Sequence, residues 1–117
     1  MSEDIRIPTS LWLDAHLRRL NEQGKGYYIV NKGAFAAGTI LLKIALLDGT
    51  ARLLTQIRNM DGQLCWMTAL KDEISSEKDV DAYIQRAIDR DPDLWAIEIE
   101  DRMGENPFEG TEIKEFS

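Results

Sequence analysis

Apolar residues recur at helical spacing in two segments of the chain. One stripe predicts a helix over residues 11–22, and its members are Leu13, Leu17 and Leu20. A second helix is expected to begin at Ser76 and to end before Pro92, because a serine can cap a helix start and a proline cannot continue a helix. Its apolar positions are Val80, Tyr83, Ile84, Ala87 and Ile88.

Strand-like segments lie between and after the predicted helices. Apolar runs meet at Asp48-Gly49 and again at Asp61-Gly62, and Asp-Gly favours a two-residue type I′ turn between antiparallel strands. These turns predict a meander whose strands are residues 39–47, 50–59 and 63–70. Aromatic and β-branched residues at 27–30, and the alternation at 94–100, predict two more strands.

Two-residue turns would also determine which residues of the meander face one another. Ile44 then lies opposite Leu53, and Ile57 lies opposite Trp66, which collects apolar side chains on one face of the sheet. The other face is expected to be mixed. Its apolar members include Leu41, Leu54 and Met67, and its basic members are Lys43, Arg52 and Arg58.

The order of the elements, α-β-β-β-β-α-β, predicts the fold class. We expect an α+β domain with an antiparallel-rich sheet of about five strands and two helices packed on one face of it. The domain is expected to span residues 1–104. Residues 105–117 are expected to form a polar, flexible C-terminal tail, in which only Phe108, Ile113 and Phe116 could dock.

Composition and charge exclude several classes of protein. The chain of 117 residues is 44% hydrophobic and 30% charged, which is typical of a globular domain and excludes disordered and collagen-like classes. The net charge of −7 argues against attraction of the whole surface to nucleic acid or anionic lipid. Cys65 is the only cysteine, and no apolar run is long enough for a bilayer, so we expect a cytoplasmic protein without a membrane partner.

One acidic pattern is spaced like the ligands of a calcium loop. Asp89, Asp91 and Asp93 alternate, and Glu100 stands at the twelfth position. However, Leu94 occupies the sixth position, where the tight turn of such a loop requires glycine. The pattern is therefore more typical of a solvated helix end that leads into a strand, and no metal site is expected.

Other chemistry has little support in the sequence. His16 is the only histidine, and Cys65 has no predicted base beside it, so both residues are interpreted as structural. Glycine-rich phosphate loops are missing, and no cofactor is expected. An enzyme would have to use the acidic Asp91–Asp101 region together with Arg18 or Arg19.

The function that we expect is therefore that of a non-catalytic protein-interaction module. Its partner would be another protein or a second copy of the chain, bound on the mixed sheet face. The alternatives are the enzyme described above and a nucleic-acid-binding protein that uses a basic sheet face, although the meander part of that face has no aromatic side chains for base stacking. The candidate binding residues are Arg18, Arg19, Lys43, Arg52 and Arg58.

The sequence resembles the mainly alphaproteobacterial family known as domain of unknown function 1491. The resemblance covers about residues 6–104, and its most specific part is the run from Asp91 to Arg102. Further matching motifs include Pro8-Thr9-x-Leu11-Trp12, Leu47-Asp48-Gly49-x-Ala51-Arg52 and Asp81-Ala82-Tyr83-Ile84. The resemblance implies a bacterial cytoplasmic origin and supplies no catalytic residues.

Overall fold

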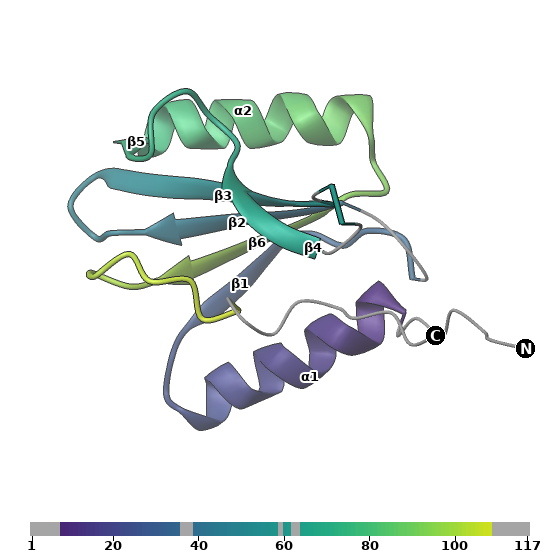
Figure 1. Ribbon diagram of the computed structural model, residues 1–117. Helices are drawn as coiled ribbons and strands as arrows, with labels where there is room; N and C mark the ends of the chain where they lie inside the picture. The colour runs from purple at the N-terminus through teal and green to yellow at the C-terminus, as the bar shows by residue number, and fades with distance from the viewer. Residues whose placement is uncertain (1–7, 36–38, 59, 62–63, 109–117) are drawn as a thin grey trace, which may run out of the picture.

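The computed structural model describes residues 8–35, 39–58, 60–61 and 64–108, and it consists of a sheet between two helices (Figure 1). The elements in chain order are α1 (Thr9–Glu22), β1 (Tyr27–Asn31), β2 (Ile40–Ala45), β3 (Thr50–Arg58), β4 (Leu64–Thr68), β5 (Ser75–Ser76), α2 (Glu77–Arg90) and β6 (Trp95–Glu100). The predicted cap of the second helix is confirmed, because the Ser76 hydroxyl accepts a hydrogen bond from the backbone N–H of Asp79.

The six-stranded sheet is mixed, with the order β1-β6-β2-β3-β4 and with β5 paired to β3. β2 and β6 run parallel, and every other pairing is antiparallel. The parallel pair requires a crossover, in which α2 brings the chain back to the sheet. The α+β class is confirmed, and β1 proves to be an edge strand that pairs with β6.

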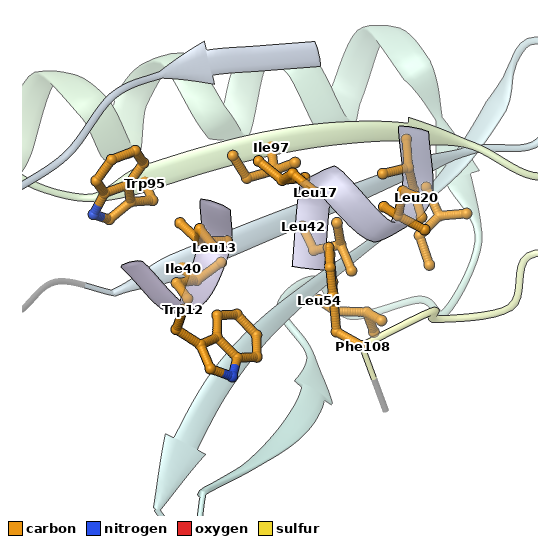
Figure 2. Close-up of a cluster of buried hydrophobic side chains, with 12 residues drawn as sticks. Trp12, Leu13, Leu17, Leu20, Ile40, Leu42, Leu54, Trp95, Ile97 and Phe108 are labelled. Atoms are coloured by element: carbon orange, nitrogen blue, oxygen red, sulfur yellow. The ribbon is translucent and has the colours of Figure 1, made fainter. Parts of the chain in front are cut away.

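The two helices cover opposite faces of the sheet, not the same face as the sequence suggested (Figure 1). We call these the α1 face and the α2 face. On the α1 face, the sheet packs against Trp12, Leu13, Leu17 and Leu20 of α1. These residues belong to one buried hydrophobic cluster, and ten of its members are labelled in Figure 2. The sheet's contribution to the α2 face includes Leu41, Ala51, Leu53 and Ala96. The physical reason is that β2 and β3 carry neighbouring apolar residues, so both of their faces need cover.

The predicted strand register is wrong by one residue in the first hairpin. Leu42 lies opposite Leu54, and Ile44 lies opposite Arg52. The backbone N–H of Leu46 bonds to the carbonyl of Thr50, which leaves Leu47, Asp48 and Gly49 as the loop. Leu47 and Gly49 both have positive φ, 64° and 89°, and such a loop is longer than the two-residue turn assumed from Asp-Gly.

The second hairpin is shifted by one residue as well. Ile57 lies opposite Cys65, and Gln56 lies opposite Trp66. The two shifts cancel between β2 and β4, so β3 alone is turned over relative to the prediction. Ile57 therefore lies on the α2 face, whereas Trp66 packs against the cluster on the α1 face.

The packed core continues beyond the predicted boundary at residue 104. Phe108 is completely buried, with its ring centroid 5.7 Å from that of Trp12 and 6.2 Å from that of Trp66. Residues 105–108 therefore hold a side chain in the core and do not form a free tail. Ile113 and Phe116 lie outside the described residues.

The loop after β1 is held tightly against the start of β6. A Cβ atom on Gly33 would lie 2.4 Å from the carbonyl oxygen of Asp93, closer than any real Cβ contact. The backbone N–H of Ala34 donates to the same carbonyl at 2.9 Å. Only glycine permits this close approach of two backbone segments.

We expect Gly33→Ala to lower the free energy of unfolding by about 1–3 kcal/mol, because the two backbones must separate to admit the methyl group. Urea denaturation measures the change. Gly26→Ala is the matched control, since its Cβ would meet only Glu100 Oε1 at an ordinary 3.7 Å. Equal stability of the Gly33→Ala and Gly26→Ala proteins would contradict the close approach.

Candidate functional site

Lys43 is a buried cation at the centre of the sheet. Its side chain is 3% exposed and projects from β2 toward the α2 face. Its Nζ lies 2.9 Å from Glu77 Oε1, 2.8 Å from Asp81 Oδ1 and 3.2 Å from Glu98 Oε1. Because Glu77 and Asp81 belong to α2 and Glu98 belongs to β6, the ammonium group joins the helix to two central strands.

The three neighbouring carboxylates determine the protonation state of Lys43. Burial by itself would lower the pKa of Lys43, but hydrogen bonds to Asp81, Glu77 and Glu98 outweigh the burial and raise the pKa above its ordinary value. Lys43 is therefore a fixed positive charge at neutral pH. It can hold carboxylates in place, and it cannot serve as a general base.

The predicted basic sheet face does not form. Lys43 lies under α2, whereas the reversed β3 places Arg52 on the α1 face. Arg52 donates a hydrogen bond to the carbonyl of Gly104 and lies 3.7 Å from Glu73. Arg58 is the last residue of β3, and its side chain lies outside the described part of the structure. The one-residue shift in the first hairpin therefore separates Lys43 from Arg52.

The remaining basic candidates lie on the exposed side of α1. Arg18 and Arg19 are both exposed, and Arg19 Nη2 donates to His16 Nδ1 at 2.9 Å. The His16 ring packs 4.7 Å from the ring of Trp12, between centroids, on the α1 face. Cys65 is half-buried and lies opposite Ile57 in the register of β3 and β4. It therefore lies on the α2 face. His16 and Cys65 are therefore not brought together as a base and a nucleophile.

The acidic Asp91–Asp101 region is used for local backbone turns. The Asp91 carboxylate accepts a hydrogen bond from the N–H of Asp93, and the Asp101 carboxylate accepts from the N–H groups of Met103 and Glu105. β6 extends between these turns, so Glu100 lies at the opposite end of the strand from Asp93. Within the described residues, no three His, Cys, Asp or Glu side chains are grouped as a metal ion would require.

The apolar patch expected on the mixed sheet face is not exposed. Leu41 and Leu54 lie on opposite faces and are each buried by a helix, and only Met67 of that set is open to solvent. A hollow of about 310 Å³ adjoins Met67 where the C-terminal half of α2 crosses the sheet. The association surface that the sequence suggested is therefore occupied by the protein's own helices.

The structure exposes a different apolar surface at β1, which the sequence analysis did not single out. Four consecutive side chains are open to solvent: Tyr27 (39% exposed), Tyr28 (67%), Ile29 (42%) and Val30 (40%). Among the described residues β1 pairs only with β6, so its other side is an unpaired strand edge. The sequence did carry a signal for this surface, because residues 27–30 are all apolar or aromatic and do not alternate with polar residues as in a half-buried strand.

A hollow of about 390 Å³ lies beside this strand edge. It is lined by Gly26, Tyr27, Tyr28, Glu98 and Glu100. Tyr28 is the register partner of Glu98, and both lie on the α2 face with Lys43. The strand edge and the hollow together form an apolar surface with acidic groups beside it, and we call this combination the β1 edge site.

The fold and this site define a small α+β protein with an uncovered apolar strand at the edge of its sheet. The chain belongs to the family described as "Protein of unknown function (DUF1491)", which matches residues 7–109. The resemblance seen in the sequence is thereby confirmed. None of the helices that the structure describes is long and apolar enough to cross a membrane.

Three solved structures of similar proteins share the fold. A crystal structure of a DUF1491 family protein from Caulobacter crescentus is 38% identical, with 85% of this chain and 92% of that chain covered and a TM-score of 0.74. An NMR structure of a DUF1491 family protein from Caulobacter crescentus is 36% identical, with 88% and 93% covered and a TM-score of 0.74. A solution structure of a protein from A. tumefaciens is 27% identical, with 83% and 87% covered and a TM-score of 0.65. The comparison with curated proteins gives no match.

We expect Lys43→Met to lower the free energy of unfolding by about 1–3 kcal/mol at neutral pH. The substitution leaves Glu77, Asp81 and Glu98 close together without their shared cation, although their partial exposure to water limits the cost. Chemical denaturation measures the change. Lys78→Met removes an exposed lysine of α2 and should change stability by no more than about 0.5 kcal/mol. An equal effect of the two substitutions would show that the buried network contributes nothing.

His16 predicts a pH dependence of stability. Burial, together with the charge of Arg19, lowers the pKa of His16, so the unfolded chain takes up a proton more readily than the folded one. The stability associated with His16 should therefore be present above about pH 6.5 and decline as the pH falls below it. Denaturation of the native protein and of His16→Asn across this range should show a shallower decline in the variant. Identical slopes would contradict the lowered pKa.

Proposed function

We propose that the protein is a non-catalytic protein-interaction module, and that the β1 edge site binds an extended segment of a partner as an additional strand of the sheet. The observation that supports this proposal is the exposure of four consecutive apolar side chains on an edge strand. An edge strand offers unpaired N–H and C=O groups, and an extended peptide can pair with them while its side chains contact alternate faces.

The described part of the edge has few of the features with which proteins usually prevent such pairing. Charged residues, prolines and covering loops normally protect an exposed edge strand. Here the strand itself, Tyr27–Asn31, carries no charged residue and no proline, and Lys25 and Lys32 lie outside its two ends. The one irregularity is a shift of register between Ile29 and Asn31. An apolar edge that is left open is typical of an interaction surface.

β1 is also held firmly enough to act as a template. The Asn31 side-chain amide donates to the carbonyl of Leu94 at 2.8 Å and to that of Pro92 at 3.2 Å. Just beyond the strand, Trp95 Nε1 donates to the carbonyl of Ala34 at 2.8 Å. A strand that is already fixed loses little conformational entropy when a partner binds, which favours affinity.

Further apolar side chains follow β1 in the chain and extend the surface toward α1. Phe35 is 61% exposed, and its carbonyl accepts a hydrogen bond from the N–H of Ser10 at 3.0 Å. Leu11, the next residue of α1, is 50% exposed. A partner segment on β1 would therefore find apolar contacts past the end of the strand.

The charges at the site favour a protein partner over nucleic acid. The rings of Tyr27 and Tyr28 could stack on bases, but Glu98 and Glu100 line the same hollow and would repel phosphate groups. The net charge of −7 opposes nucleic acid over the molecule as a whole.

The proposal predicts that peptides selected from a random library will bind at β1. In NMR titrations of labelled protein, the largest amide shifts should fall in β1 and in its neighbour β6. Ile29→Lys should weaken the selected peptides by at least about tenfold, because it places a charge in the apolar contact. Met67→Lys introduces the same charge at an exposed apolar residue of β4, the other edge strand, and should leave binding unchanged. Shifts centred elsewhere, or equal weakening by the two substitutions, would refute the β1 edge site.

A further inference from the structure

We infer that the segment bound at the β1 edge site is basic, and that one of its Lys or Arg side chains crosses Tyr28 to reach Glu98 and Glu100. This inference rests on the proposed function and names the chemistry of the partner. It depends on which groups lie on the α2 face beside β1, on how far they are from an added strand, and on the charge that they leave uncompensated.

The first step is the arrangement of the acidic groups. Glu98 and Glu100 are two residues apart on β6, so both project toward the α2 face next to β1. Glu98 is 27% exposed, with one carboxylate oxygen 3.2 Å from Lys43, while Glu100 is exposed. Gly26 lies beside Glu100, because a Cβ atom built on it would be 3.7 Å from Glu100 Oε1. As a glycine, it has no side chain that could fill the hollow. The carboxylates are therefore accessible from the hollow.

The second step is the charge around the hollow. Within the described residues, Lys43 contacts Glu77, Asp81 and Glu98 together, so one cation is shared among three carboxylates. The cluster keeps a net negative charge, to which Glu100 adds. Because Lys43 is buried and its pKa is raised, it remains charged and already engaged. Lys43 is therefore not available to pair with Glu100, and a basic side chain of a bound segment would find negative charge in the hollow.

The third step is distance. Adjacent strands lie about 4.8 Å apart, so a strand added outside β1 would be about 10 Å from β6. A short side chain on the added strand would contact Tyr28 only, whereas the long side chains of Lys and Arg can cross the ring and reach the carboxylates. Tyr28 is 67% exposed, and an aromatic face attracts a cation that lies over it.

A second copy of the chain would fit this site poorly. Paired Tyr27–Asn31 strands would place Tyr, Ile, Val or Asn over Tyr28, and a basic residue, Lys25 or Lys32, would approach it only if the pairing ran past the ends of the strand. An acidic segment would be repelled by Glu98 and Glu100. A basic segment therefore complements both the apolar edge and its acidic neighbour.

Two designed peptides test the inference. Both alternate valine with a second residue, which is lysine in one peptide and glutamine in the other, so that apolar and polar side chains lie on opposite faces of the bound strand. We expect the lysine peptide to bind at least about tenfold more tightly at low salt, with the preference decreasing as salt rises. Fluorescence anisotropy gives the affinities, and NMR shifts at β1 give the location.

Matched variants separate the local charge from the charge of the whole protein. Glu98→Gln with Glu100→Gln should remove most of the preference for lysine, because it lowers the affinity of the lysine peptide far more than that of the glutamine peptide. Glu73→Gln removes an exposed carboxylate that does not line the hollow and should retain the preference. Tyr28→Leu should reduce the preference several-fold, because it removes the aromatic face that the cation would cross.

The outcomes distinguish this inference from the proposed function. Equal affinity of the two peptides at β1 would overturn the basic partner and leave strand addition intact. A lysine preference that survives loss of Glu98 and Glu100 would also overturn it, as would self-association in sedimentation experiments that is accompanied by NMR shifts at β1. If neither peptide binds and no amide of β1 shifts, the proposed function and this inference both fail.

Discussion

Burial of β2 and β6 between the two helices is the interaction on which the rest of the structure depends. Every residue of β2 is buried, with Ile40, Leu42 and Ile44 under α1 and their neighbours under α2. β6 lies between β1 and β2, and it runs parallel to β2, which requires a crossover connection. Because β6 occupies this inner place, β1 lies at the edge of the sheet among the described residues, with its apolar side chains partly exposed. The candidate interaction surface is thus a consequence of how the core is assembled.

Lys43 links the core to that surface. A lysine on a central strand would be unfavourable in an apolar environment, and the fold accommodates it by bringing three carboxylates from α2 and β6 to its ammonium group. One of them, Glu98, also lines the hollow beside Tyr28. The same arrangement that stabilises the docked helix therefore leaves negative charge next to the open strand. Glu98 therefore contributes to the stability of the fold and, in the interaction that we propose, to the recognition of a partner.

The register of the meander shows where local signals stop being sufficient. Asp48-Gly49 correctly marks a turn, but Leu47 also adopts a positive φ, and the loop gains a residue. β3 contains Leu53 and Leu54 side by side, so either register would bury a leucine on each face. The apolar pattern therefore could not detect the shift. Its consequence was large, because it separated Lys43 from Arg52 and removed the basic face on which a nucleic-acid interpretation depended.

The sequence by itself determined the two helices, the longer strands, the α+β class and the family, because helical periodicity, turn residues and local motifs are properties of neighbouring positions. It also named Phe108 as a residue able to dock. Only the tertiary structure decided that β1 pairs with β6, that the helices lie on opposite faces, and that Glu98 lies between Lys43 and Tyr28. These relations join segments that are far apart in the chain. Periodicity records how side chains alternate within one strand, and it carries no information on which strand lies beside it or which edge remains open.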